Sequence, residues 1–180
     1  MRRKGSLNGN AIVATVMSNL GLHEFCRKGD FLLVCTDVGD RHVLEKMIEC
    51  GYMIGGEQSG HTIFREYATT GDGELTSLQF LQILKRSGKR ASELVSCCAQ
   101  YPQVLVNAKI NNDYKKTYMK DAEVAAAIQE LERKMAGNGR VLIRPSGTEP
   151  LVRVMIEGKD QKVIDEEAKK LADLITRIML

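Results

Sequence analysis

Short apolar runs alternate with segments of helical spacing over the first half of the chain, and this pattern constrains its fold more than any other feature. Residues 11–17 and 31–35 are apolar runs typical of buried strands, and a third run starts at residues 52–54. Apolar residues with helical spacing follow the first two runs and recur over residues 75–84. Strands that alternate with helices predict an α/β unit.

The pattern changes near residues 85–102, which are charged and rich in small side chains. The order after this segment is strand, helix, strand, strand, helix, which is typical of an α+β domain. We therefore predict an α/β domain over residues 1–90, followed by an α+β domain over residues 91–180.

Three features define the elements of the second domain. Apolar side chains alternate with polar ones over residues 104–110, the period of a half-buried strand. Asp121 is placed to cap a helix whose apolar stripe extends to Met135. Residues 141–143 and 151–156 are two further apolar runs, separated by a connection short enough for a hairpin.

The composition excludes several classes of protein. Of the 180 residues, 43% are apolar, which is enough for a packed core. The 26 basic and 23 acidic residues leave a net charge of +3, too balanced for the basic stripe of a nucleic-acid-binding protein. No run approaches the roughly 18 apolar residues that span a bilayer. We therefore expect neither a nucleic acid nor a membrane as a partner.

The five cysteines are an odd number, and their spacing matches no zinc site. Cys35 ends an apolar run and Cys50 lies in a helical pattern, so both are expected to be buried as small apolar side chains. Reduced thiols predict a cytoplasmic protein.

Residues 144–150 read RPSGTEP, a composition typical of a phosphate-binding loop. The guanidinium group of Arg144 matches phosphate oxygens, and Ser146 and Thr148 supply hydroxyl donors. Gly147 permits backbone conformations in which successive amide groups converge on an anion. The alternative is a hairpin turn without a ligand, which needs no arginine or paired hydroxyls.

Arg153 lies in the strand that follows this loop, among apolar neighbours. An arginine there is costly to bury unless it is paired, so it is predicted to supply a second guanidinium group to the same phosphate. The alternative is an exposed arginine at the sheet edge, with its aliphatic stem over apolar neighbours.

A second polar loop, GGEQSGH at residues 55–61, follows the third strand. Ligands of α/β sheets bind at the carboxyl ends of strands, and Glu57 and Ser59 offer the acceptors and donors that sugar hydroxyls need. His61 is a candidate acid, base or phosphate donor. A glycine-rich polar turn without function is the alternative.

These loops resemble the α-D-phosphohexomutase superfamily. The resemblance rests on GEQSGH, on TGDGELTSLQ from residue 70 and on GRVLIRPSGTEPLVRVMIEG from residue 139, and it covers the chain from about residue 7. Gln58 favours the phosphoglucosamine mutase branch, since the phosphomannomutase/phosphoglucomutase branch tends to have methionine there.

The resemblance implies a fold and a set of site residues. It implies that residues 1–90 are domain three, a small three-layer α/β domain, and that residues 91–180 are domain four, with a mostly antiparallel four-stranded sheet packed by helices. Domain three would bind the sugar through Glu57, Gln58, Ser59 and His61, with His61 either beside the phosphate or acting in proton transfer. Domain four would bind the phosphate that is not transferred, through Arg144, Ser146, Gly147, Thr148 and Arg153.

The same resemblance implies an activity and its cofactors. The family's phosphoserine donates phosphate to glucosamine 6-phosphate, and the resulting glucosamine 1,6-bisphosphate returns its other phosphate to leave glucosamine 1-phosphate. The phosphoserine loop and the Mg²⁺ loop belong to domains one and two, and neither motif is present here, so no metal ligand is expected in this chain.

The implied partners are a phosphosugar and the N-terminal half of the mutase, and the chain alone is expected to be inactive. Apolar surface left exposed without that half would favour a homo-oligomer. The alternatives are a phosphosugar-binding or regulatory module without catalysis, or part of a phosphomannomutase/phosphoglucomutase.

Overall fold

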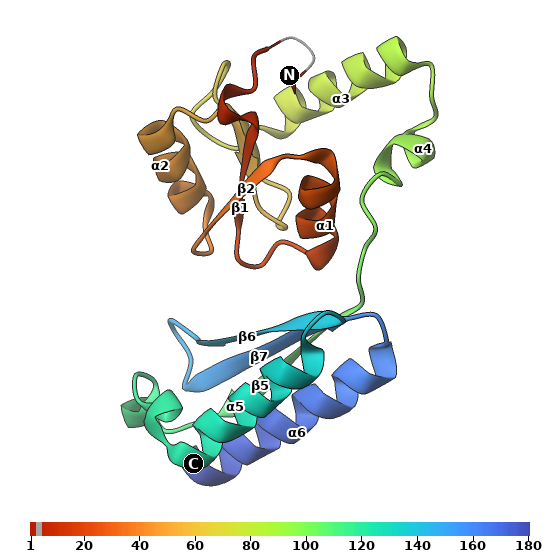
Figure 1. Ribbon diagram of the computed structural model, residues 1–180. Helices are drawn as coiled ribbons and strands as arrows, with labels where there is room; N and C mark the ends of the chain where they lie inside the picture. Colours follow the sequence, from red (N-terminus) through yellow and green to blue (C-terminus); the bar gives the residue numbers. More distant parts are fainter. Residues whose placement is uncertain (3–4) are drawn as a thin grey trace. The chain divides into compact units, whose positions relative to one another are not determined.

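The computed structural model describes residues 1–2 and 5–180, which form two compact units, Met1–Gln100 and Tyr101–Leu180 (Figure 1). Helix α4 (Ala91–Val95), which the sequence analysis assigned to the second domain, belongs to the first unit. The segment after α4 packs on α1 (Leu20–Gly29), since a Cβ atom added to Gly21 would lie 1.5 Å from the carbonyl oxygen of Ala99.

The first unit contains a four-stranded sheet with the order β2-β1-β3-β4. Strand β1 pairs in parallel with β2 and β3, and β3 pairs antiparallel with β4. The strands are β1 (Ala11–Thr15), β2 (Leu32–Thr36), β3 (Ile54–Gly56) and β4 (Thr62–Phe64). The predicted α/β alternation is therefore confirmed, and the polar loop at residues 57–61 is the connection between β3 and β4.

Helices cover both faces of this sheet, which confirms the three-layer arrangement (Figure 1). On one face, Val43 and Met47 of α2 (Asp40–Cys50) pack with Val13 of β1. Ile12 points to the opposite face because side chains alternate along a strand, and there it lines a groove with Phe25 of α1 and Ile83 of α3 (Gly73–Ser87).

Capping residues explain where these helices begin and end. The side chain of Asn19 accepts a hydrogen bond from the amide of Gly21 at the start of α1, and Asp72 caps α3 in the same way. Helix α2 ends at Gly51, whose φ of 73° is in the left-handed region that glycine adopts without strain.

The second unit contains an antiparallel sheet with the order β5-β7-β6, formed by β5 (Gln103–Lys109), β6 (Gly139–Pro145) and β7 (Leu151–Gly158). The antiparallel pairing is confirmed, but the described residues form three strands in this sheet and not four. The fourth strand was implied by the family resemblance alone, and the apolar pattern of the second half contains only three strand-like runs.

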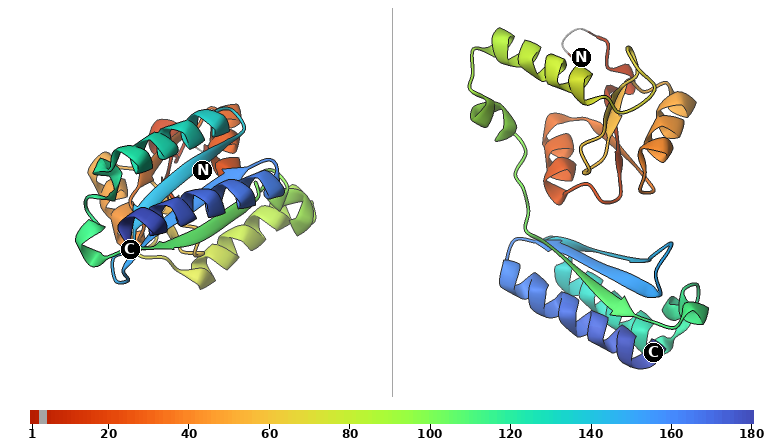
Figure 2. Two further views of the ribbon diagram at one scale, coloured as in Figure 1. Left: turned by 90° about the horizontal axis from the view of Figure 1, so that it is seen from below. Right: turned by 180° about the vertical axis from the view of Figure 1, so that it is seen from behind.

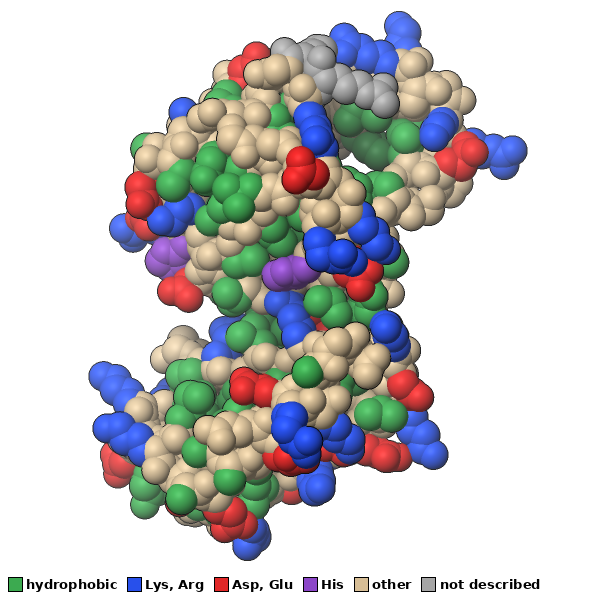
Figure 3. Space-filling view, viewed as in Figure 1, with side chains coloured by type: hydrophobic (Ala, Val, Ile, Leu, Met, Phe, Trp, Pro, Cys, Tyr) green, Lys and Arg blue, Asp and Glu red, His purple; other side chains and the backbone are tan. Residues whose placement is uncertain are grey.

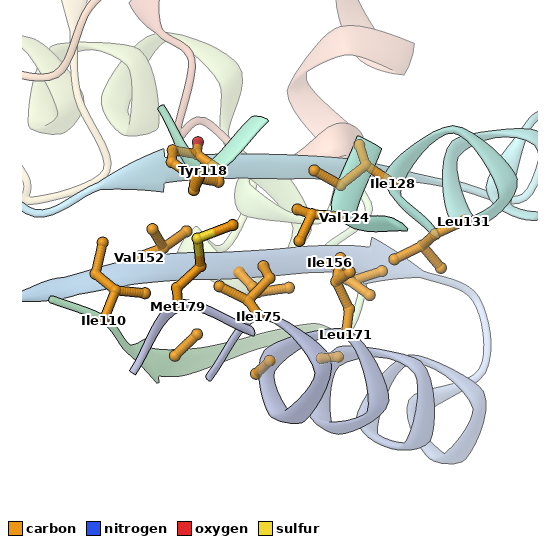
Figure 4. Close-up of a cluster of buried hydrophobic side chains, with 14 of the residues drawn as sticks. Ile110, Tyr118, Val124, Ile128, Leu131, Val152, Ile156, Leu171, Ile175 and Met179 are labelled. Atoms are coloured by element: carbon orange, nitrogen blue, oxygen red, sulfur yellow. The ribbon is translucent and has the colours of Figure 1, made fainter. Parts of the chain in front are cut away.

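Two long helices, α5 (Ala122–Met135) and α6 (Gln161–Met179), cover one face of this sheet (Figures 1 and 2). Figure 4 shows the core that they form with the sheet, into which Ile128 of α5, Ile156 of β7 and Ile175 of α6 project. Every member of the predicted α5 stripe is buried, namely Val124, Ile128, Leu131 and Met135. The short 3-10 helices Asn8–Asn10, Asn112–Tyr114 and Tyr118–Lys120 complete the described structure.

The cysteines differ from the expectation. Cys35 and Cys50 are exposed, whereas Cys26 on the inner side of α1 is buried, and this burial raises the pKa of its thiol. An apolar neighbourhood in the sequence does not determine which side of a strand or helix faces the core. The prediction that Cys35 and Cys50 are buried is therefore wrong.

Two bulk properties of the described residues bear on partners. On the face that Figure 3 shows, lysine and arginine side chains are interspersed with aspartate and glutamate over both units. None of the helices in the described part of the chain is both long enough and apolar enough to cross a membrane.

We expect Gly21→Ala to destabilise the first unit, because the added Cβ would collide with the Ala99 carbonyl group and overpacking of this kind costs about 1–3 kcal/mol. Gly73→Ala in α3 is the matched control, since its Cβ would meet no heavy atom within 4 Å. Urea denaturation of both variants measures the difference. Equal stability of the two variants would show that residues 97–100 do not pack on α1.

Candidate functional site

The RPSGTEP segment forms the turn of the β6–β7 hairpin. The amide of Ser146 donates to the carbonyl oxygen of Leu151 at 2.9 Å, and the amide of Glu149 donates to the Ser146 hydroxyl at 3.2 Å. The Ser146 side chain is only 4% exposed, so it is part of the framework of the turn. Internal hydrogen bonds therefore hold the turn.

Gly147 has a different role from the one the sequence analysis gave it. Its φ is not positive, and a Cβ atom built on it would meet no heavy atom within 4 Å. Neither the backbone conformation nor the protein's own packing requires glycine there. The space beside Gly147 is open to whatever approaches the turn from outside.

Arg144 and Arg153 lie directly opposite each other in the β6–β7 pair. The Nε atom of each is buried without a hydrogen-bond partner among the described residues. Burial, and then the nearby charge of Arg153, lowers the pKa of Arg144. Two adjacent cations with unused donors form an anion-binding arrangement, because an unpaired buried charge is costly until an anion offsets it.

The row of side chains containing these arginines extends across the sheet, on the face opposite the helices. Asn107 of β5 is in register with Arg153, which places it in the same row, and it is exposed. Glu149, in the turn, pairs with Arg153 at 3.2 Å between Oε2 and Nη2. Sequence reasoning missed Asn107 and Glu149. The spacing of four residues to Arg153 would have indicated Glu149, whereas Asn107 is identified by the pairing of β5 with β7.

The second candidate loop connects β3 and β4 and holds three polar side chains together. The Ser59 hydroxyl donates to Oε1 of Glu57 at 2.6 Å and lies 2.8 Å from Nδ1 of His61. Because the hydroxyl proton is directed at Glu57, the Nδ1–H group of His61 is the donor to the Ser59 oxygen, which leaves Nε2 of His61 available to a ligand. Gly60, with φ of 100°, allows the turn that brings them together.

This loop lies at the carboxyl ends of β1 and β3, as predicted. A pocket of about 260 Å³ is lined there by Ser18, Gly56, Glu57, Gln58 and Thr62, among others. The structure thus brings Glu57, Ser59 and His61 into mutual contact and places Gln58 at the pocket beside them. Arg144, Ser146, Gly147, Thr148 and Arg153 are likewise gathered on one hairpin, in the second unit.

The described residues do not form a metal site. Within residues 1–2 and 5–180, no group of three or more histidine, cysteine, aspartate or glutamate side chains is placed to hold a metal ion. The β3–β4 loop offers hydrogen-bonding groups, and the β6–β7 hairpin adds the charge of two arginines.

Comparison with known proteins identifies the two units. Residues 1–101 match the model of the phosphoglucomutase/phosphomannomutase α/β/α domain III, and residues 105–174 match the model of the C-terminal domain of the same proteins. The chain belongs to the phosphoglucomutase/phosphomannomutase family.

Curated members of this family with high similarity are phosphoglucosamine mutases. The one from Caldanaerobacter subterraneus subsp. tengcongensis is 56% identical over 177 residues, which are 98% of this chain and 40% of that protein. The one from Clostridium botulinum strain Kyoto is 55% identical over 175 residues, 97% of this chain and 39% of that protein. The chain therefore spans about 40% of the length of these relatives and corresponds to their third and C-terminal domains.

Solved structures of the family share the fold. The N-acetylphosphoglucosamine mutase of Aspergillus fumigatus, solved with GlcNAc-6P and magnesium, aligns with a TM-score of 0.77 at 22% identity, over 94% of this chain and 39% of that one. A phosphoglucomutase/phosphomannomutase family protein from Burkholderia thailandensis aligns with a TM-score of 0.70 at 19% identity, over 94% and 38% of the two chains. At these identities the likeness is evidence for the family fold.

Proposed function

We propose that this chain supplies the sugar and phosphate recognition of a phosphoglucosamine mutase. The observation that carries the proposal is the Arg144–Arg153 pair, whose two buried Nε atoms have no partner among the described residues. The relatives that are phosphoglucosamine mutases at 56% identity supply the choice of glucosamine phosphate as ligand.

The phosphate group is assigned to the β6–β7 hairpin. Arg144 and Arg153 donate from their guanidinium groups, which match phosphate oxygens in geometry and charge. Thr148 adds its hydroxyl, and Ser146 holds the turn in shape. Gly147 keeps the turn open, so that phosphate oxygens can reach the backbone amide groups.

The sugar is assigned to the β3–β4 loop. Glu57 accepts hydrogen bonds from sugar hydroxyls, Gln58 lines the same pocket, and Ser59 contributes through its hydrogen bond to Glu57. His61 is held through Nδ1, so its Nε2 atom is the group that exchanges or donates a proton to the ligand. This division suits a bisphosphate that must bind in two orientations, because hydroxyl recognition and phosphate recognition use separate loops.

The complete reaction is proposed for the full-length protein. Glucosamine 6-phosphate would become glucosamine 1-phosphate through glucosamine 1,6-bisphosphate, with the phosphoserine and Mg²⁺ supplied by the first two domains of the family. The described residues of this chain do not form the Mg²⁺ site, so the N-terminal half is the proposed partner for catalysis. The cytoplasmic location and the homo-oligomer stay predictions from the thiols and from exposed apolar surface.

The binding proposal is tested by NMR titration of the full chain with glucosamine 6-phosphate, glucose 6-phosphate and glucosamine. We expect the two phosphates to shift amide signals of residues 144–148 and Arg153, and the unphosphorylated sugar to leave them unchanged. Micromolar affinity would favour a self-sufficient binding module, whereas millimolar affinity would favour the recognition part of a larger enzyme. A hairpin that does not respond to any phosphate would refute the proposal.

Catalysis by this chain alone is expected to be undetectable. Its described residues contain sugar and phosphate donors but no metal cluster that could offset the charge of a transferring phosphoryl group. Purified chain with glucosamine 6-phosphate, a hexose bisphosphate and Mg²⁺ is the assay, with a full-length phosphoglucosamine mutase as positive control. Turnover that chelation of the metal abolishes would contradict this expectation.

We expect Gly147→Ala to weaken phosphate binding by about ten-fold without changing stability. A methyl group there meets no protein atom but takes up the space where an anion would approach the amide groups, and one lost charge-assisted hydrogen bond is worth about 1.5–3 kcal/mol. Titration with inorganic phosphate and urea denaturation measure the two effects. Unchanged affinity would place the phosphate away from the turn.

A further inference from the structure

We propose that Glu149 is an intramolecular stand-in for the ligand. Its carboxylate forms an ion pair with Arg153 when no anion is bound, and it moves away from Arg153 when a phosphate group binds. The inference rests on the proposed phosphate site and adds a residue that lowers the affinity of that site for anions.

The first step is the position of the carboxylate. Glu149 Oε2 lies 3.2 Å from Nη2 of Arg153 and 3.5 Å from the hydroxyl oxygen of Ser146. Arg153 is one of the groups that the hairpin offers to a phosphate, and Ser146 holds the turn beside it. The carboxylate therefore competes with an incoming anion for the same hydrogen bonds.

The second step is that Glu149 satisfies only part of the hairpin. No ion pair joins Arg144 to any residue in the described part of the chain, and the Nε atoms of Arg144 and Arg153 both stay unpartnered. Two cations face one carboxylate, which leaves a net positive charge. An anion with more oxygens and more charge than a carboxylate gains contacts that Glu149 does not make.

The third step is that Glu149 can leave at low cost. Its side chain is 55% exposed and that of Arg153 is 31% exposed, and ion pairs of such exposure contribute little. The backbone of Glu149 is held separately, because its amide donates to the Ser146 hydroxyl at 3.2 Å. The carboxylate can thus rotate into solvent while the turn keeps its shape.

The consequence is a lower affinity for every anion that must displace the carboxylate. The carboxylate is tethered beside the arginine at high effective concentration, so it lowers the affinity of each displacing ligand by a similar factor. A tetrahedral dianion also reaches the donors that the carboxylate leaves unused, and it therefore binds strongly enough to displace Glu149 where a weaker ligand such as acetate does not.

The test compares the wild type with Glu149→Gln, and uses Glu166→Gln on the exposed face of α6 as the matched control for the change of net charge. Calorimetric titration uses inorganic phosphate, at a pH where the dianion dominates, and acetate. We expect Glu149→Gln to bind phosphate about two-fold to five-fold more tightly, the range expected for removal of an exposed ion pair, and to bind acetate more tightly by a similar factor. Glu166→Gln should match the wild type for both ligands.

Each other outcome has a definite meaning once circular dichroism has shown that the variants are folded. If the wild type binds phosphate and Glu149→Gln binds it equally or more weakly, the stand-in role is overturned and the proposed phosphate site is retained. If neither binds phosphate, both proposals are overturned. If only Glu149→Gln binds phosphate, the competing role is supported in its strongest form.

Discussion

Arg144→Met is expected to make the second unit more stable while removing its affinity for phosphate. The guanidinium group has a buried Nε without a partner and lies opposite Arg153, so it is held at a cost. Methionine keeps the apolar stem and removes both the unpaired donor and the repulsion. We expect a gain of about 1 kcal/mol in the free energy of unfolding, because an unsatisfied buried donor costs about 1–3 kcal/mol.

The loss of affinity should be larger than the gain in stability. Hydrogen bonds to charged groups are worth about 1.5–3 kcal/mol, so removing one guanidinium group should weaken phosphate binding by about ten-fold to a hundred-fold. Arg133→Met on α5 is the matched control, since Arg133 is exposed and already paired with Glu130. It should change neither property beyond about 0.5 kcal/mol.

Urea denaturation and phosphate titration of the two variants decide the question. If Arg144→Met were less stable than the wild type, packing of the arginine stem would outweigh the cost of its charge. If it bound phosphate as the wild type does, the anion site would have to be elsewhere. Opposite signs for stability and affinity are the specific signature of a side chain kept for its ligand.

Arg140→Met is expected to have the largest effect on stability of any substitution considered. Arg140 Nε donates to Oε2 of Glu157 at 2.6 Å, and the Glu157 side chain is 0% exposed. Removing the arginine takes this cation away from a buried carboxylate, which typically costs about 3–5 kcal/mol. Because whole domains are stable by only about 5–15 kcal/mol, the second unit should lose most of its stability.

The double variant Arg140→Met/Glu157→Leu separates the two causes of that loss. Apolar replacement of both members of a buried pair is often neutral or stabilising, so we expect most of the lost stability to return. Denaturation curves for the single and double variants form the measurement. A single variant within about 0.5 kcal/mol of the wild type would show that the pair is effectively solvated.

Periodicity predicted the elements well because it reports directly on burial. The α5 stripe of Val124, Ile128, Leu131 and Met135 is buried as a set, and Asp121 caps this helix as expected. Strand β6 is longer than the predicted run at residues 141–143, since pairing with β7 extends it to Gly139 and Pro145. Local patterns specify which segment forms an element, and neighbouring strands determine where it ends.

Features that depend on long-range neighbours could not be predicted. The Arg140–Glu157 pair joins residues that are adjacent only once the hairpin register is known. Assignment of residues 91–100 to the first unit depends on a contact between Ala99 and Gly21, which no local pattern records. Cys35 and Cys50 lie in apolar segments but are exposed, because composition does not specify a side.

The candidate site was predictable in its residue types but not in its electrostatics. RPSGTEP indicated a phosphate loop, and the structure adds that Arg144 and Arg153 are directly opposed. The role of Gly147 changed from permitting a strained backbone to leaving space outside the turn. Glu149 appeared in the sequence only as one residue of the loop, and its contact with Arg153 became visible with the turn geometry.

The residues of the anion-binding arrangement all lie on the β6–β7 hairpin, so the arrangement can be moved to another protein as one segment. Both guanidinium groups, the turn hydroxyls and the competing carboxylate come from residues 144–153, a continuous stretch of two strand ends and a turn. Such a stretch can be transplanted as a cassette onto another antiparallel sheet, provided that the register opposing Arg144 to Arg153 is kept. A β-rich protein of unrelated origin carrying this cassette would be a compact starting point for an engineered phosphate sensor.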